Sequence, residues 1–332
     1  MSEAPPAELT AAHVYRARRA IAAAVCRTPL VPAASLSDGD GREFRMKLET
    51  LQPTGAFKLR GASNKLGVLS AEQRARGVVA VSSGNHGRGI ALAARRLGMR
   101  AVVCMGSLVP GNKVEAIKAL GAEVRIIGDS QDEAEVEARR LVDEEGLVEA
   151  HPFDDPWVIA GQGTIGLELM EDWPELDTVI VPLSGGGLIG GIALAVKAVS
   201  PATRVVGVSM ERGAAMIRSL EAGKPVFVEE LATLADALGG GIGLDNRYTF
   251  ALVRELVDET VTVTEEEIAD GMRHLFWREQ MVVEGAGAVG VAALLAGKIR
   301  GLGQRVALVI SGRSTDMHDF MSIVSGGGAA GD

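Results

Sequence analysis

The sequence predicts an α/β protein built from open, twisted, mainly parallel sheets that are covered by helices. Three observations lead to this prediction. Short runs rich in β-branched residues alternate with segments of helical period along the 332 residues. Most of the strand-like runs are largely apolar, as is typical of strands buried on both faces. Glycine-rich turns follow several of these runs and precede helical segments, as in units of parallel strands connected by helices.

The predicted strands are short apolar or β-branched runs bounded by turn residues. In chain order they are Glu43–Leu48, Val78–Val81, Ala101–Met105, Glu123–Ile127, Thr178–Leu183, Arg204–Ser209, Glu259–Val263 and Arg305–Ile310. The predicted helices between them are Ala56–Val68, Gly87–Leu97, Lys113–Leu120, Ser130–Glu145, Trp157–Glu171, Leu188–Val199, Glu265–Trp277 and Ala286–Leu295. The clearest helix start is Thr264, because Glu267 completes a capping box with it.

The length of the chain predicts roughly two domains. The segment Gly77–Ala150 contains its own alternation of strands and helices, with glycine-rich loops before and after it. We therefore expect a small domain, 59–149, inserted into a larger one that is formed by 1–58 and 150–332. Residues 325–332, with the sequence SGGGAAGD, are expected to be a disordered tail.

Composition and charge exclude several classes of function. The chain has 34 Lys and Arg against 43 Asp and Glu, a net charge of −9, which is unfavourable for binding nucleic acid or an anionic membrane. No apolar run is long enough to span a membrane, and the N-terminus does not resemble a signal peptide. The two cysteines are too few for a disulfide framework. We expect a cytoplasmic protein.

Glycine is the unusual residue of this composition. The chain contains 42 glycines, where average usage would give roughly 23. Glycine lets the backbone come close to a ligand, and loops that bind a small anion use it in this way. The excess therefore directs attention to the loops that follow the predicted strands.

The segment Ser184–Gly191 follows an apolar strand and opens an apolar helix. Its glycines allow backbone N–H groups to converge on an anion, which the positive end of the helix dipole also favours. We predict that this turn binds a phosphate. Gly185, Gly187 and Gly190 also fit the dinucleotide pattern G-x-G-x-x-G, with Glu211 downstream, so an NAD-binding oxidoreductase is an alternative. The same spacing recurs elsewhere in this glycine-rich chain, so the pattern alone decides little.

Two further segments carry polar chemistry. Ser82–Gly89, with the sequence SSGNHGRG, also joins a strand to a helix, and its hydroxyl and N–H groups suit a carboxylate; the alternative is an ordinary helix cap. His86 by itself is more typical of a structural hydrogen bond than of a catalyst. Lys58 follows the break Pro53–Gly55 and lies between two apolar residues, where desolvation would lower the pKa of its amine and favour nucleophilic use. The alternative is a solvated surface lysine.

Six segments in this order resemble the fold-type II pyridoxal-phosphate enzymes, in the branch of threonine dehydratases and serine racemases. They are KLETLQPTGAFKLRGA, SSGNHGRG, HPFDDPWVIAGQGTIGLEL, PLSGGGLIGG, EGAGA and SGRSTD. The segments Ser209–Met216 and Ala235–Phe250 look like the hydroxyectoine-utilisation dehydratases of bacteria. The resemblance implies a two-domain fold like that of the tryptophan synthase β-subunit, with pyridoxal 5′-phosphate as cofactor.

The resemblance also assigns roles. Lys58 would form a Schiff base with the cofactor aldehyde and then act as base on the substrate Cα proton. The other implied cofactor contacts are Phe57 near the ring, Asn85 on the ring 3-hydroxyl, the N–H groups of Gly185, Gly186, Gly187 and Leu188 on the phosphate, and Ser311 at the pyridine nitrogen. The substrate carboxylate would be bound by Ser83, Gly84, Asn85 and His86.

The implied reaction is removal of water from a β-hydroxy-α-amino acid, threonine-like, serine-like or derived from hydroxyectoine, to give a keto acid and ammonia. The alternative within the family is a racemase, in which Ser83 supplies a proton on the face opposite Lys58. Ser209 stands where racemases carry an acidic metal ligand, so we expect no metal site. The usual SGGN is SGRS here, which leaves Arg313 and Ser314 unexplained. We expect a homodimer whose only ligands are small molecules.

Overall fold

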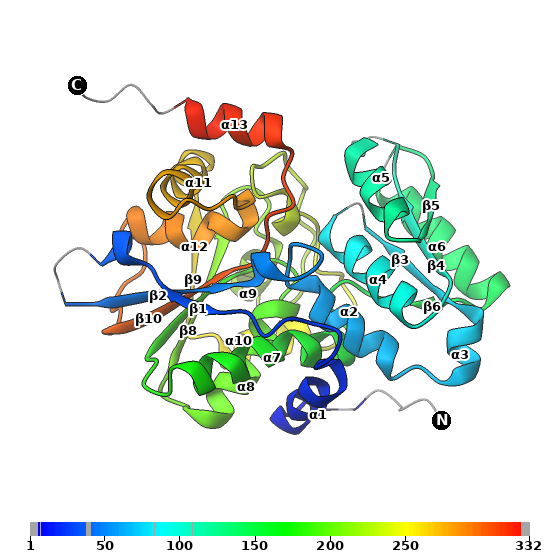
Figure 1. The fold of residues 1–332 in the computed structure, drawn as a ribbon, viewed down its shortest axis with the longest axis horizontal. Helices are drawn as coiled ribbons and strands as arrows, with labels where there is room; N and C mark the ends of the chain where they lie inside the picture. The colour runs from blue at the N-terminus through cyan, green and yellow to red at the C-terminus, as the bar shows by residue number, and fades with distance from the viewer. Residues whose placement is uncertain are drawn as a thin grey trace.

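The computed structural model describes residues 6, 8–37, 41–82, 84–107, 109, 111–129 and 131–326. Two sheets lie side by side, each with helices on both faces (Figure 1). The larger sheet has the strand order β1-β2-β10-β7-β8-β9, and the smaller has the order β5-β4-β3-β6. All neighbouring strands pair in parallel except β1 and β2, which are antiparallel.

The described strands match the predicted ones closely. They are β1 (Leu30–Pro32), β2 (Glu43–Leu48), β3 (Val78–Val81), β4 (Ala101–Met105), β5 (Glu123–Ile126), β6 (Val148–Glu149), β7 (Thr178–Pro182), β8 (Arg204–Met210), β9 (Glu259–Val263) and β10 (Arg305–Ile310). All eight predicted strands are present, and the two that the prediction missed, β1 and β6, are very short. The predicted fold class is confirmed.

The helices are more numerous than predicted. They are α1 (Ala11–Ile21), α2 (Lys58–Gly67), α3 (Ala71–Arg76), α4 (Asn85–Arg96), α5 (Gly111–Ala119), α6 (Gln131–Glu145), α7 (Pro156–Asp172), α8 (Gly187–Val199), α9 (Ala215–Ala222), α10 (Thr249–Leu256), α11 (Glu265–Glu279), α12 (Gly285–Leu295) and α13 (Met317–Ser325). The eight predicted helices are all present. The capping box is confirmed: Thr264 Oγ1 accepts from the N–H of Glu267, and the Glu267 carboxylate accepts from the N–H of Thr264.

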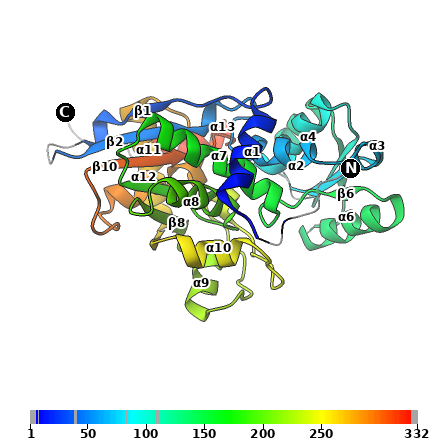
Figure 2. The same ribbon diagram turned by 90° about the horizontal axis from the view of Figure 1, so that it is seen from below.

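The central strands of the large sheet, β7, β8 and β10, are buried on both faces, which explains why they are largely apolar. Along β10, Leu308 and Ile310 pack into the core beneath α11 and α12, whereas Ala307 and Val309 pack into the core beneath α7 and α8. Because side chains alternate between the faces of a strand, both faces need apolar residues. Figures 1 and 2 show these helix pairs on opposite sides of the sheet.

All four strands of the smaller sheet lie within 78–149, inside the range predicted for the small domain. The exact domain boundaries stay a prediction. Ser325, which we placed in the disordered tail, is the last residue of α13, and residues 327–332 lie outside the described part.

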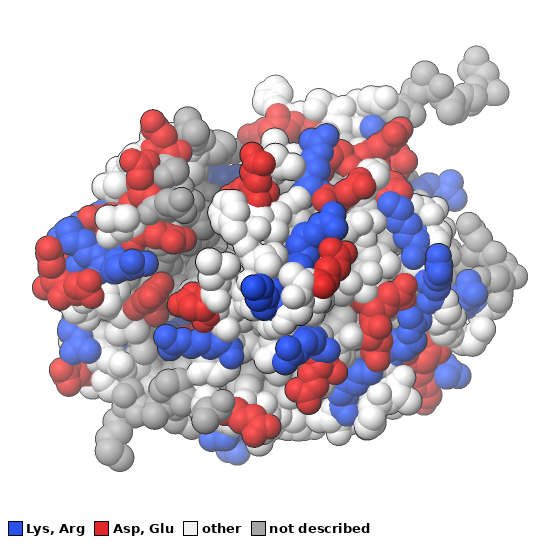
Figure 3. Space-filling model, turned by 180° about the vertical axis from the view of Figure 1, so that it is seen from behind, with Lys and Arg blue, Asp and Glu red and all other residues white. Residues whose placement is uncertain are grey.

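Within the described part of the chain, no helix is both long and apolar enough to cross a membrane. On the face shown in Figure 3, positive and negative side chains are interspersed over the surface. That mixture is unlike the continuous positive surface with which proteins follow a nucleic acid backbone.

The order of the strands fixes where a ligand can bind. From β7 the chain passes through α8 to β8 on one side, while β10 lies on the other side of β7. Such a reversal leaves a crevice at the carboxyl ends of the two central strands. The predicted phosphate turn follows β7 and Ser311 follows β10, so both lie at this crevice.

Candidate active site

A cavity of about 1730 Å³ lies at the carboxyl ends of β7 and β10 and extends toward the smaller sheet. It brings together the predicted site residues that the structure describes. Its lining includes Phe57, Lys58, Gly84, Asn85, His86, Gly185, Gly186, Gly187, Leu188 and Ser311. Ser83, the remaining predicted residue, lies outside the described part.

The turn between β7 and α8 is shaped for an anion. Gly186 has φ +88°, a left-handed conformation that favours glycine. A Cβ on Gly185 would overlap the ring of Phe153, and one on Gly187 would lie 2.9 Å from the carbonyl oxygen of Phe153. Only glycine therefore lets this turn lie against Phe153. The first N–H groups of α8 have no partner within the helix and face the same crevice.

We expect Gly185→Ala to weaken the binding of pyridoxal phosphate about tenfold or more, because the new methyl group would push the turn away from Phe153. Titration of the apoprotein with the cofactor, followed by absorbance, measures this. Gly190→Ala is the matched control, since a Cβ there meets Leu252 at 3.4 Å, an ordinary contact. Equal affinities for the two variants would contradict this account of the turn.

Lys58 is the first residue of α2 and reaches into the cavity. Its Nζ donates a hydrogen bond of 2.7 Å to the carbonyl oxygen of Pro152 and lies 5.3 Å from the centre of the Phe57 ring. Burial lowers the pKa of this amine to about 8. Lys58 is therefore not a solvated surface lysine, and a substantial fraction of it is neutral at mildly alkaline pH.

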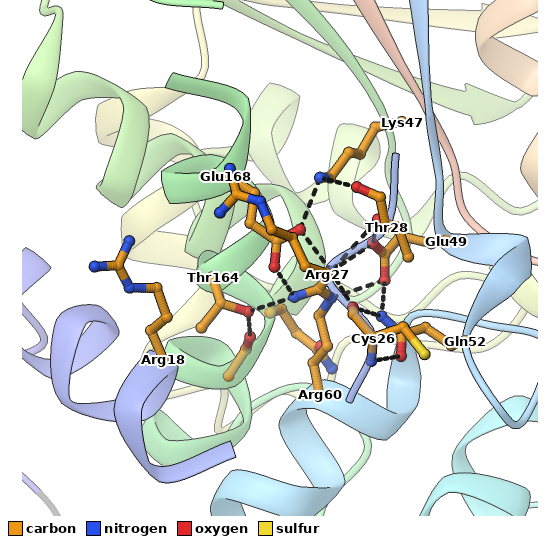
Figure 4. Close-up of polar contacts among 12 residues, drawn as sticks. Arg18, Cys26, Arg27, Thr28, Lys47, Glu49, Gln52, Arg60, Thr164 and Glu168 are labelled. Atoms are coloured by element: carbon orange, nitrogen blue, oxygen red, sulfur yellow. Dashed lines mark hydrogen bonds and ion pairs between the residues drawn. The ribbon is translucent and has the colours of Figure 1, made fainter. Parts of the chain in front are cut away.

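A buried ionic network holds the helix that carries Lys58 (Figure 4). The Arg60 guanidinium donates to both oxygens of Glu49 at 2.8 Å and to those of Glu168 at 2.6 and 2.9 Å. Lys47 adds an ion pair of 2.7 Å to Glu168. All four side chains are buried, so two cations and two anions balance beneath the cavity. Sequence reasoning missed this network, although Lys47 and Glu49 lie in KLE, Arg60 in KLR and Glu168 in GLEL.

The pKa of Glu49 follows from this pairing. Burial by itself would raise the pKa of Glu49, but the charge and the hydrogen bonds of Arg60 more than offset it, so the net pKa lies below the usual range. The helix is also held by close backbone contact, since a Cβ on Gly161 of α7 would lie 2.6 Å from the Cα of Gly61. The position of Lys58 is thus set by α7 and by the segment after β2.

The start of α4 supplies the second set of polar groups. Gly84 is the N-cap, and Asn85 and His86 are the first residues of the helix. His86 Nε2 lies 2.7 Å from the carbonyl oxygen of Ala150. Burial, together with the charge of Lys58, lowers the pKa of His86 to about 3, so the ring is neutral. This agrees with the structural role expected for it.

Glu284 is a site residue that the sequence analysis did not select. It precedes α12, is 4% exposed, and lines the cavity. Its Oε1 accepts a 2.8 Å hydrogen bond from Asn85 Nδ2, and its Oε2 accepts from the N–H of Ser314. Ser314 Oγ in turn accepts from Arg88 at 2.7 Å. These contacts give Ser314 a structural role, because they connect α4 to the loop after β10. Arg313 is exposed at the edge of the cavity.

These groups fit pyridoxal phosphate. The cavity offers an amine of lowered pKa, a turn that only glycine can form, and a buried neutral serine, Ser311, at the end of β10. Asn85 Oδ1 is buried and has no hydrogen-bond partner among the described residues. An orphaned polar atom in a cavity is the mark of a group that a ligand completes. No cluster of three or more His, Cys, Asp or Glu side chains suited to a metal ion occurs in the described part.

Comparisons with known proteins identify the family of this chain. A family model described as pyridoxal-phosphate dependent enzyme matches residues 21–312. An L-threonine ammonia-lyase of Thermotoga maritima is 46% identical, over 96% of this chain and 79% of that protein. The crystal structure of a T.th. threonine deaminase is 42% identical, with a TM-score of 0.85 over 92% of this chain and 99% of that one. Maize serine racemase is 35% identical, with a TM-score of 0.90 over 96% and 98% of the two chains.

The comparisons confirm the predicted cofactor and the predicted type of enzyme, a pyridoxal-phosphate-dependent ammonia-lyase. They lend no support to the dinucleotide alternative. The family model covers Lys58, the glycine turn and most of the rest of the sequence. The chain belongs to the pyridoxal-phosphate dependent enzymes.

Proposed function

We propose that this enzyme removes water from a β-hydroxy-α-amino acid and releases ammonia, leaving a keto acid. The observation that carries the proposal is the position of Lys58, whose amine enters the same cavity as the glycine turn, Asn85 and Ser311. The 46% identity to an L-threonine ammonia-lyase supports the reaction type.

The residues that would hold the cofactor come from three elements. The N–H groups of Gly185–Leu188 would bind the phosphate, Asn85 would meet the ring 3-oxygen, and Ser311 would face the pyridine nitrogen. When bound, pyridoxal phosphate supplies the electron sink that makes the Cα proton of an amino acid removable. A serine at the pyridine nitrogen is neutral, so it would leave that nitrogen largely unprotonated and moderate the sink.

Lys58 is suited to hold and move a proton at Nζ. Its pKa of about 8, lowered by burial, lets the neutral amine accept a proton without a large energetic cost near neutral pH. The Pro152 carbonyl oxygen accepts its hydrogen bond and fixes the direction of the amine. Lys58 is therefore the base that we assign to the Cα proton.

The first turn of α4 would bind the substrate carboxylate. Backbone N–H groups from Gly84 onward lie at the positive end of a helix of 12 residues. His86 is neutral, so its side chain adds no positive charge at this end of the helix. Ser83, by its place in SSGNHGRG, would add a hydroxyl. With the substrate carboxylate held at α4 and the cofactor phosphate held at the glycine turn, the Cα–H bond of the substrate would be oriented toward Lys58.

Two finer points belong to the proposal. The segments resembling the hydroxyectoine-utilisation dehydratases include the loop Gly239–Arg247, which lines the cavity and would meet the substrate side chain. A hydroxyectoine-derived hydroxy amino acid is therefore a candidate beside threonine and serine. The racemase alternative is kept because maize serine racemase is similar to this chain over almost its whole length. In that reaction Ser83 would act as the second base beside Lys58.

We expect incubation with L-threonine, L-serine or a hydroxyectoine-derived hydroxy amino acid to yield a keto acid and ammonia as the main products. Keto acid measurement and chiral chromatography of the remaining amino acid separate the two reactions. A D-amino acid that accumulates faster than the keto acid would overturn the dehydratase assignment in favour of the racemase. The relative rates on the three substrates would show which substrate side chain the enzyme prefers.

A further inference from the structure

The contact between Glu284 and Asn85 constrains which end of the Asn85 amide faces the cofactor. An ionised carboxylate can only accept hydrogen bonds. Asn85 therefore gives its NH₂ group to Glu284 Oε1, at 2.8 Å. Its other end, Oδ1, is left buried and without a partner in the described part of the chain. In this arrangement the end of the Asn85 amide that Glu284 does not hold is an acceptor.

An acceptor does not suit the expected ligand once it is ionised. The ring 3-oxygen of pyridoxal phosphate is acidic, and as an anion it needs a donor. Asn85 can supply one only if the amide turns and directs Nδ2 to the cavity. Oδ1 then meets Glu284, and two acceptors in contact are unfavourable unless one of them carries a proton.

We propose that Glu284 takes up a proton when pyridoxal phosphate binds, and that this proton lets the Asn85 amide turn its NH₂ group to the ring oxygen. The proton comes from solvent and forms an O–H bond on Glu284, which then donates to Asn85 Oδ1. The turn of the amide itself changes no covalent bond, and the Schiff base at Lys58 would form separately, with release of water. Glu284 is thus a positioning residue that acts through Asn85, and the inference rests on the proposed placement of the ring at Asn85.

The surroundings of Glu284 make this uptake accessible. Burial, helped by the charge of Asp236, raises its pKa to about 7, while the Ser314 N–H group, Asn85 and the charge of Lys113 oppose the rise. Asp236 begins a short 3₁₀ turn and pairs with Lys113 of α5 at 2.8 Å, so these two charges largely compensate each other. A carboxyl near its midpoint at neutral pH can be moved to either state by one hydrogen bond.

The test compares the apoprotein and the loaded protein, wild type against Glu284→Gln, at a pH about one unit above the pKa of Glu284. Difference infrared spectroscopy should show the C=O stretch of a protonated carboxyl appearing on cofactor binding in the wild type only. Calorimetry in buffers of different ionisation enthalpy should show about one more proton taken up per chain by the wild type than by Glu284→Gln. A glutamine already donates to Asn85 Oδ1, so it needs no proton.

A second variant keeps the test decisive if Glu284→Gln does not fold. Asp236→Asn removes a charge that raises the pKa of Glu284, so the pH range of the uptake should shift downward with the proton count unchanged. Equal uptake by wild type and Glu284→Gln, or an Asp236→Asn profile that does not shift, would overturn the inference. A wild type that forms its visible band at Lys58 but takes up no more protons than Glu284→Gln would overturn it while leaving the proposed function intact.

Discussion

Lys58→Ala should bind pyridoxal phosphate without developing the visible absorption band of a cofactor joined to a lysine, and its dehydratase activity should fall about 10³-fold or more. The reason is that alanine has no amine to react with the aldehyde and none to remove the Cα proton. Absorption spectra before and after borohydride treatment measure the first effect, and keto acid release measures the second. Wild type should lose its band on reduction.

Lys118→Ala is the control, because Lys118 is an exposed lysine of α5 that does not line the cavity. It should keep both the band and the activity. The wild-type apoprotein adds a pH test: the rate at which it develops the band should rise with pH through a midpoint near 8, where half of the buried amine has lost its proton, and level off above it. A Lys58→Ala protein that develops the lysine-linked absorption band would contradict the role of Lys58. So would a wild-type rate of band formation that keeps rising with pH toward the pKa of an ordinary lysine.

Arg60→Met should destabilise the protein by about 3–5 kcal/mol, because it leaves the carboxylates of Glu49 and Glu168 buried without their shared cation. The midpoint of chemical denaturation of the apoprotein measures this. The folded state holds the pKa of Glu49 below its usual value, so the stabilisation is present at neutral pH and lost as the pH falls into the acid range. Arg60→Met should therefore show a weaker loss of stability in acid than the wild type.

Arg218→Met is the matched control, since Arg218 makes an exposed ion pair with Glu221 on α9. Its stability should change by no more than about 0.5 kcal/mol. An Arg60→Met protein that unfolds at the wild-type midpoint would show that the network does not stabilise α2. A destabilised Arg60→Met that also binds pyridoxal phosphate less tightly would fit a network that positions Lys58 as well as the fold.

The central strands were predictable because each is a contiguous, largely apolar run. Thr178–Pro182 and Arg305–Ile310 lie between cores on both faces of the sheet, so neither face needs polar residues and the run is easy to recognise. Helices such as α3 and α9 were missed because one or two turns are too short for a helical period to stand out. Their stability comes from packing rather than from their own sequence.

The site was predictable in part, for a related reason. The glycine turn, Lys58 and Asn85 belong to continuous motifs, so their resemblance to a family was visible in the chain. Glu284 was missed although it lies in EGAGA, because its partners Asn85 and Ser314 are far away in sequence. Only after α4 and the loop after β10 are placed together does a glutamate become a buried group that titrates near neutral pH.

The sequence by itself determined the alternation of strands and helices, the glycine turn after β7 and the place of Lys58 at the start of α2, because these depend on residues close together in the chain. The tertiary structure alone decided which charges meet. Arg60 bridges Glu49 and Glu168, and Glu284 meets Asn85, through contacts between residues about ten to two hundred positions apart. Burial and pairing set the protonation of these groups, and both depend on how distant segments pack rather than on any local pattern.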